Sequence, residues 1–180
     1  MNRCKWVNLN NSLYVNYHDL EWGVPKYDDY ILFELLILEM FQAGLSWECI
    51  LNKRESFRTA FDNFDYDLVS KYDGKKINEL LNNDSIIRNR LKIKASIENA
   101  KIFIKIRNEY GSFSKYIWRF TNNKIIKNNN DLFVTHNKLS DQISTDLKDR
   151  GMKFVGSVII YSYLQAIGII NDHELNCMCY

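Results

Sequence analysis

The sequence predicts an all-helical fold. One proline and seven glycines in 180 residues leave few positions that interrupt a helix. Apolar residues recur at three- and four-residue spacing through most of the chain, and no segment alternates cleanly enough to predict a strand. A hydrophobic fraction of 46% is typical of a chain that folds around a core, and the length fits one domain over residues 1–180.

The expected helices follow one another along the chain. The first is capped by Asp28 or Asp29 and runs to about Gly44; the second is capped by Ser46 and carries apolar residues as far as Phe61. Further helices are predicted over 65–72, 75–82, a basic segment around 93–104, 112–120, 140–149, and 157–167, which Gly168 closes. The Asn- and Lys-rich run 121–130 is interpreted as a surface loop.

Composition excludes several classes of protein. The longest apolar stretch, 31–41, contains Glu34 and Glu39 and is too short to span a bilayer. The first residues lack the apolar core of a signal peptide, so we expect a cytoplasmic protein without membrane contact. In that compartment four cysteines indicate metal binding or simple burial rather than disulfides. A net charge of +2 permits a local DNA-binding face but does not indicate one.

Metal-type ligands gather at the two ends of the chain. They are Cys4 and His18 near the start, and His173 and Cys177 near the end. The last two are four residues apart, a spacing that points both donors the same way on a helical turn. Two Cys and two His complete a closed tetrahedral set, which is typical of structural zinc. The alternative is that all four are ordinary core or surface residues; Cys49 and Cys179 are spare thiols, and Cys179 could replace Cys177.

Glu39 is a carboxylate in a segment that is apolar on nearly every helical face. Burying it is unfavourable unless it is paired, and such positions are often retained for function; the alternative places it on a solvated edge of the helix. Aromatic residues flank it in the sequence, and their rings could stack on nucleobases or simply fill the core: Tyr14, Tyr17, Trp22 and Trp47.

The segment 150–157 joins two expected helices through a turn that contains two glycines. A helix that begins directly after such a turn exposes backbone N–H groups able to hold a phosphate. Lys148, Arg150 and Lys153 add positive charge there. The same connection also occurs as mere packing between helices.

Together these blocks resemble the 3-methyladenine DNA glycosylase I family, from residue 3 to residue 180. The resemblance is carried by Arg3-Cys4-x-Trp6, Tyr17-His18-Asp19-x-Glu21-Trp22-Gly23-Val24-Pro25, Gln42-Ala43-Gly44-Leu45-Ser46-Trp47, Ile86-Ile87-Arg88-x-Arg90-x-Lys92-Ile93, Lys153-Phe154-Val155-Gly156 and Asn171-Asp172-His173-x-x-x-Cys177-x-Cys179-Tyr180. The chain departs from the family pattern by one extra residue before Tyr14, by Leu91 in place of a glycine, and by a shorter loop after Thr121.

The resemblance implies the helix-hairpin-helix glycosylase fold. In that fold residues 150–157 form the hairpin that holds DNA phosphates, with Arg150, Lys153, Gly156 and Ser157 as contacts. Segments 1–25 and 169–180 pack together around one structural zinc bound by Cys4, His18, His173 and Cys177. Glu39 corresponds to the base-recognition carboxylate, with Tyr14, Tyr17, Trp22 and Trp47 as the base-binding aromatics. Leu45 is a candidate wedge for the gap that a flipped nucleotide leaves.

The implied activity is base-excision repair. The enzyme would hydrolyse the N-glycosidic bond of 3-methyladenine in alkylated double-stranded DNA and release the free base. No lysine is placed to form a Schiff base, so we expect a monofunctional enzyme that does not cleave the strand. We also expect a monomer. Asp172 is interpreted as a support for the metal-binding segment. Alternatives are a non-enzymatic helical DNA-binding module, a sibling glycosylase for another lesion, and a zinc-stabilised interaction protein.

Overall fold

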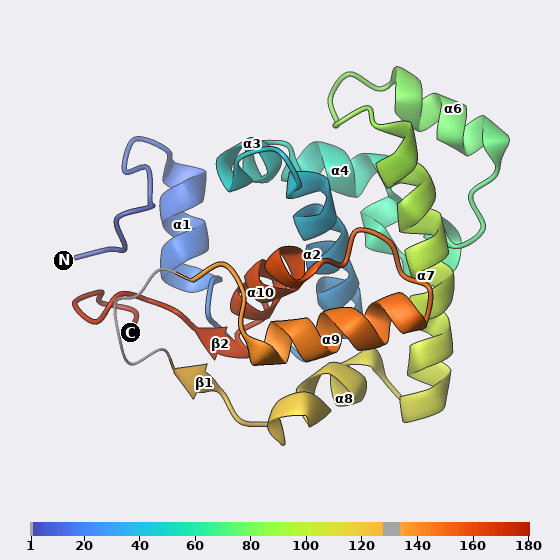
Figure 1. Cartoon of the computed structure of the whole chain (residues 1–180). Coiled ribbons are helices and arrows are strands. Elements are labelled where there is room, and N and C mark those ends of the chain that lie inside the picture. The colour runs from blue at the N-terminus through green and yellow to red at the C-terminus, as the bar shows by residue number, and fades with distance from the viewer. Residues whose placement is uncertain (1, 128–133) are drawn as a thin grey trace.

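Helix α2 (Asp29–Gln42) lies at the centre of the computed structural model, which describes residues 2–127 and 134–180 (Figure 1). Every side chain from Leu32 to Phe41 is buried, because apolar residues occupy all faces of this helix. The helices α3, α7, α8 and α10 pack directly around it.

The remaining elements confirm a helical protein. In chain order they are α1 (Ser12–Leu20), α3 (Trp47–Asn52), α4 (Arg54–Ala60), α5 (Tyr66–Val69), α6 (Gly74–Asn82), α7 (Arg90–Tyr110), α8 (Phe113–Trp118), β1 (Ile126–Lys127), α9 (Lys138–Asp149), α10 (Ser157–Ala166) and β2 (Ile170–Asn171), with short 3₁₀ turns at Asp62–Phe64 and Arg119–Thr121.

Local side-chain caps explain where most helices begin. A polar side chain just before the helix accepts hydrogen bonds from the first-turn N–H groups, which have no partner inside the helix. Asp28 does this for α2 and Ser46 does it for α3, as the sequence predicts. The other caps of this kind are Asn11, Asp65, Asp73, Asn89, Ser112 and Asn137.

Two predictions about the first third of the chain were wrong. Helix α1 was not expected, because its exposed Leu13 and Leu20 obscure its periodicity. The helix expected from Ser46 to Phe61 is two helices that break at Lys53. The break lets the buried Arg54 guanidinium form ion pairs with two carboxylates from other segments, Glu21 and Glu34.

The start and the end of the chain are joined through backbone contacts. Gly23 N–H donates to the Gln165 carbonyl, and Lys26 N–H donates to the Ile167 carbonyl, each at 3.0 Å. Gly168, at φ +76°, lies so close to the Val24 backbone that a Cβ atom there would be 2.3 Å from the carbonyl carbon. The strands were not predicted: β1 and β2 are two-residue segments that pair in parallel, and β1 lies inside the expected 121–130 loop, of which residues 128–130 fall outside the described ranges.

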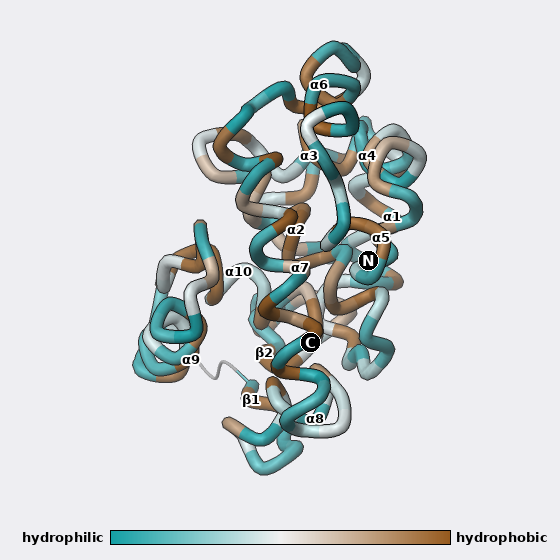
Figure 2. The backbone as a smooth tube through the Cα atoms, turned by 90° about the vertical axis from the view of Figure 1, so that its right-hand side faces the viewer, coloured by the Kyte–Doolittle hydropathy of each residue, from teal (hydrophilic) through white to brown (hydrophobic). Residues whose placement is uncertain are grey.

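The molecule is elongated between α6 at one end and α8 at the other, with α2 and α7 between them (Figure 2). Helices α9 and α10 pack side by side against this middle region, and both chain ends lie on the same side (Figure 1). Among the described helices, none has the length and apolar character that a membrane crossing requires.

Candidate functional site

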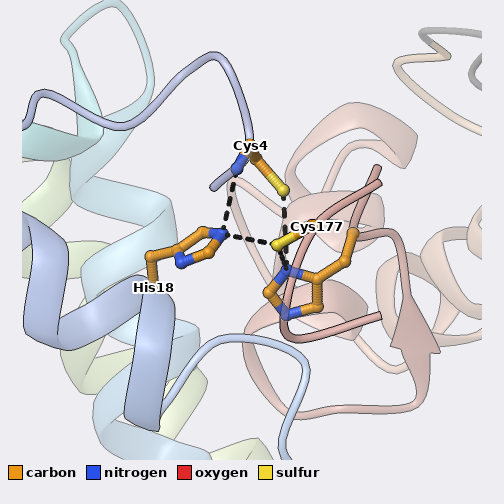
Figure 3. Close-up of side chains that lie close together, drawn as sticks. Cys4, His18 and Cys177 are labelled. Carbon is orange, nitrogen blue, oxygen red and sulfur yellow. Dashed lines mark hydrogen bonds between the residues drawn. The ribbon is translucent and has the colours of Figure 1, made fainter. Parts of the chain in front are cut away.

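The four candidate metal ligands meet in one buried cluster. The ligand atoms of Cys4, His18, His173 and Cys177 all lie within 4.8 Å of one another, and all four residues are buried. Figure 3 shows Cys4 on the N-terminal segment, His18 on α1, and Cys177 on the C-terminal segment converging on one point. We call this cluster the clasp.

The spacing of the donors fits a tetrahedral metal ion. Zinc–sulfur bonds of about 2.3 Å and zinc–nitrogen bonds of about 2.0–2.1 Å place sulfur and nitrogen about 3.5 Å apart around a tetrahedral ion. Cys177 Sγ lies 3.4 Å from His18 Nε2 and 3.5 Å from His173 Nδ1. Cys4 Sγ lies 3.5 Å from His173 Nδ1. The four side chains could therefore hold a metal with little rearrangement.

One detail of this prediction was wrong. His173 and Cys177 are not on a helix; a single turn, closed by a 2.8 Å bond from Cys177 N–H to the Glu174 carbonyl, brings them together. Cys179 does not join the four-residue cluster, although it lies near His18 and Asp19.

Each clasp histidine has an outer partner that fixes which nitrogen faces the sulfurs. His18 Nδ1 lies 2.7 Å from Asp19 Oδ1, and His173 Nε2 lies 3.2 Å from the Trp22 carbonyl. Such partners orient ligands around a metal and hold the ring nitrogen that binds it free of a proton. Asp19 is held in turn by the Arg3 guanidinium at 2.7 Å, whose hydrogen bond lowers the pKa of Asp19 to about 2.

Backbone N–H groups also point at the two sulfurs. Glu174 N–H lies 3.4 Å from Cys4 Sγ, and Cys179 N–H lies 3.4 Å from Cys177 Sγ. Burial raises the pKa of the Cys4 thiol to about 12, and the hydrogen bond from Glu174 N–H opposes this rise.

Glu39 is buried in the middle of the protein without full hydrogen bonding. It lies near the end of α2 and is 3% exposed, so the alternative of a solvated edge was wrong. Its Oε2 atom has no hydrogen-bond partner among the described residues, and burial raises the pKa of Glu39 to about 8. A buried, unpaired carboxyl oxygen is rare in folded proteins and suggests a ligand-binding role.

Tyr17 and Trp47 form an aromatic pair beside this carboxylate. Their ring centroids lie 5.2 Å apart, and both side chains are buried. Burial raises the pKa of Tyr17 well above its ordinary value, and the nearby charge of Glu39 raises it further. Trp47 Nε1 is the second buried polar atom without a partner in the described part of the chain. The region therefore combines flat apolar surfaces with an unsatisfied donor and an unsatisfied acceptor.

The other two aromatic candidates lie closer to the clasp. The Trp22 ring packs edge-on against His173, at 4.6 Å between centroids, and against Trp6 at 4.9 Å. The half-buried Tyr14 also contacts Trp6, at 5.2 Å. Trp6 therefore links Tyr14 and Trp22, although sequence reasoning gave it no role.

The turn that carries Leu45 projects an apolar side chain into solvent. It connects α2 to α3 through Gly44, whose φ of +83° is accessible mainly to glycine. Leu45 is 41% exposed. The wedge role that the resemblance implies for Leu45 stays a prediction.

The segment between α9 and α10 forms the expected turn. Lys153 is exposed, Gly156 leads into α10 without a side-chain cap, and Ser157 is the half-buried first residue of that helix. The first N–H groups of α10 can thus face a ligand. Arg150 differs from the expectation: its guanidinium is already paired with Glu109 at 2.6 Å and Asp146 at 2.8 Å.

Asp172 has the position of a support. Its Oδ2 atom accepts hydrogen bonds from Tyr161 at 3.0 Å and from Gln165 at 2.5 Å, both on α10. These bonds anchor the segment that leads to His173.

Several site residues were not found by sequence reasoning. Asp19 carried a signal, because it directly follows a candidate ligand, His18. Lys92 lies in one of the blocks that carry the resemblance but was given no role, and Asn99 carried no signal. Each acts through contacts about 50 residues away in sequence.

Comparisons with known proteins agree with this geometry. The chain matches the methyladenine glycosylase family over residues 6–180. It is 42% identical to DNA-3-methyladenine glycosylase 1 of Escherichia coli, over 100% of this chain and 97% of that protein. It is 41% identical to DNA-3-methyladenine glycosylase of Haemophilus influenzae, over 98% of this chain and 97% of that one.

Solved structures are similar over the same length. A crystal structure of 3-methyladenine DNA glycosylase I superposes with a TM-score of 0.95 at 40% identity, covering 99% of this chain and 100% of that one. The Staphylococcus aureus 3-methyladenine DNA glycosylase I, in a structure that concerns recognition of 3-methyladenine, gives 0.94 at 37% identity, covering 99% and 96%. The chain therefore belongs to the methyladenine glycosylase family.

Proposed function

We propose that this protein excises 3-methyladenine from alkylated double-stranded DNA by hydrolysing the N-glycosidic bond, without cutting the strand. The whole chain, 1–180, acts as one monomeric domain. The observation that carries the proposal is Glu39: a buried carboxyl with an unpaired oxygen, beside Tyr17 and Trp47. The relatives named above are glycosylases of this specificity, which supports the assignment.

The chemistry of the substrate matches this pocket. Methylation at N3 makes the attached adenine cationic, and a cationic base leaves readily. Once the nucleotide is extruded, a carboxylate accepts hydrogen bonds from the base and offsets its charge, while aromatic faces stack on the ring. A neutral adenine offers no charge to offset the burial of an ionised Glu39, so the pocket discriminates against undamaged bases.

Charge also distinguishes substrate from product. Cleavage sends the electrons of the glycosidic bond into the ring, so the released base is neutral. Water supplies the hydroxyl group that forms the new bond to the sugar carbon, and its other proton is lost to solvent. The attraction of Glu39 for the base is therefore weaker after cleavage than before it. This difference favours product release.

The remaining parts position DNA and stabilise the fold. Lys153 and the N–H groups at Gly156 and Ser157 hold backbone phosphates, and Leu45 fills the gap left by the extruded base. Arg150 supports the turn through its ion pairs with Glu109 and Asp146.

The clasp is proposed to bind one zinc ion. Its four ligands leave no open position, so the zinc cross-links the two ends of the chain and takes no part in the reaction. Elemental analysis of protein purified without chelator should find about one zinc per chain. A folded protein free of metal would refute this assignment.

The central test is release of bases from DNA treated with a methylating agent, analysed by chromatography. Wild-type protein should release 3-methyladenine. Glu39→Gln should reduce the excision rate by at least about 100-fold. This is the size expected when an active site loses one charged interaction with the reacting group. The matched control is Glu98→Gln, which removes an exposed carboxylate of α7. Release of a different base would reassign the lesion, and no release at all would favour a binding module.

A further inference from the structure

One face of α7 carries three buried polar side chains. Lys92, Ser96 and Asn99 are each less than 9% exposed and are spaced four and three residues apart, so they lie on the same side of the helix. Among the described residues, the Ser96 hydroxyl donates only within α7, to the Lys92 carbonyl at 3.0 Å. The other two reach out of the helix, and each reaches a different turn.

Asn99 holds the backbone of the turn between α9 and α10. Its Oδ1 accepts from Lys153 N–H at 2.8 Å, and its Nδ2 donates to the Lys153 carbonyl at 2.9 Å. Both backbone groups of one residue are thus fixed by one fully buried side chain. The same turn also touches α7 at Gly151, where a Cβ atom would lie 3.4 Å from Ile102 Cδ1.

Lys92 holds the turn that carries Leu45. Its Nζ donates to the carbonyls of Phe41 and Ala43, at 2.9 and 2.7 Å. These carbonyls lie at the C-terminal end of α2, where carbonyl groups have no N–H partner within the helix. A positive charge is favourable at this end of a helix. The bonds fix how the chain leaves α2, just before Gly44 and Leu45.

We propose that Lys92 and Asn99 are positioning residues that set the separation of the two DNA-contacting turns. They are seven residues apart on one rigid helix, an axial rise of about 10.5 Å. DNA presents its phosphates at fixed spacing, so a phosphate-holding turn and a wedge act together only at one separation. The inference rests on the proposed function, because it assigns those roles to Lys153 and Leu45.

A purely structural role makes a different prediction. If the two side chains only satisfy buried backbone groups, replacing them lowers stability but leaves DNA binding and excision unchanged in the folded fraction. If they position the turns, the variants lose DNA-specific functions while the base pocket still works. Binding of free 3-methyladenine, followed by tryptophan fluorescence, reports on the pocket alone.

The experiment compares Asn99→Leu and Lys92→Met with Ser96→Ala, a control that removes a buried hydroxyl from the same face of α7. Three quantities are measured on folded protein: Kd for undamaged duplex, Kd for free 3-methyladenine, and the single-turnover excision rate at saturating methylated duplex. N99L should raise the duplex Kd about tenfold, because it removes both hydrogen bonds that hold the Lys153 backbone in place. K92M should lower the saturated rate about tenfold. Free-base Kd should stay within about twofold throughout.

Two results would overturn the proposal: a duplex Kd for N99L equal to that of S96A, or a saturated rate for K92M equal to wild type. If N99L does not fold, Ser144→Ala replaces it, because Ser144 Oγ donates to the Val155 carbonyl of the same turn at 2.6 Å. S144A should raise the duplex Kd about threefold, and an unchanged value overturns the role of the turn. A wild-type protein that binds duplex but releases no 3-methyladenine would refute the proposed function; loss of duplex binding in N99L would then still support the role of Asn99.

Discussion

The burial of Glu39 should make the protein less stable as pH rises. Burial raises its pKa from 4.5 to about 8, so between these values the folded state holds a proton that the unfolded chain releases. The contribution of Glu39 to the free energy of unfolding is therefore fully present below about pH 4.5. It is lost progressively as pH rises towards 8. At about 1.4 kcal/mol per pKa unit, the loss is about 1 kcal/mol at pH 5 and about 3 kcal/mol at pH 7.

Glu39→Gln removes this pH-dependent term, because glutamine does not ionise. Between pH 5 and pH 7, the difference in unfolding free energy should shift in favour of the variant by about 2 kcal/mol. Urea unfolding at pH 5, 6, 7 and 8 measures it as a difference of unfolding free energies. Subtracting the wild-type value from the variant value cancels the titration of every other group. A pH-independent effect of the new amide does not change how this difference varies with pH.

A stability difference that does not change with pH would refute the reasoning, since it would mean that Glu39 is not buried as a proton-binding carboxyl. Glu98→Gln is the control and should show no such slope. Combined with the expected loss of excision, the result would place Glu39 among residues that reduce stability and are kept for activity.

Three further predictions concern the clasp, the turn proposed to contact DNA, and the close approach of Gly168 to Val24. Asp19→Asn should weaken metal binding about 10- to 100-fold in competition with a chelator; an unchanged affinity would remove Asp19 as an orienting partner. Lys153→Ala should reduce the slope of log K for duplex binding against log salt concentration by about one, whereas Arg150→Ala should lower stability and leave that slope unchanged. Equal slopes for both variants would contradict the assignment of a phosphate contact to Lys153 and a structural role to Arg150. Gly168→Ala should destabilise the protein by about 2–4 kcal/mol in urea unfolding, because its Cβ would lie 2.3 Å from the Val24 carbonyl carbon; a neutral effect would disprove the contact.

The helices were predictable where the signals are local. Asp28 and Ser46 mark helix starts through bonds to their own next residues, and periodicity within α7 reports one buried face. The division at Lys53 was not predictable, because it accompanies ion pairs of Arg54 with carboxylates that are distant in sequence. The two-residue strands are likewise too short to leave a pattern, and they pair across 44 positions, from Ile126 to Ile170.

The candidate site divides in the same way. The clasp ligands could be proposed from residue type, because cysteine and histidine are typical metal ligands. Glu39 could be proposed because a carboxylate is unusual within an apolar segment. Asparagine and lysine at Asn99 and Lys92 are ordinary helix residues by type. Only their long-range contacts distinguish them, and those contacts exist only once the chain has folded.

The clasp also has a consequence for the order of events during synthesis. Its ligands Cys4 and His173 are 169 residues apart, so at about 5–20 residues per second the first ligand is made roughly 8–34 seconds before the third. Metal can be fully coordinated only by a finished chain. A cross-link closing so long a loop removes roughly 5 kcal/mol of disorder from the unfolded state in the chain-entropy description. The proposed metal binding would thus act as a check that synthesis has passed Cys177, because chains lacking this residue have an incomplete ligand set.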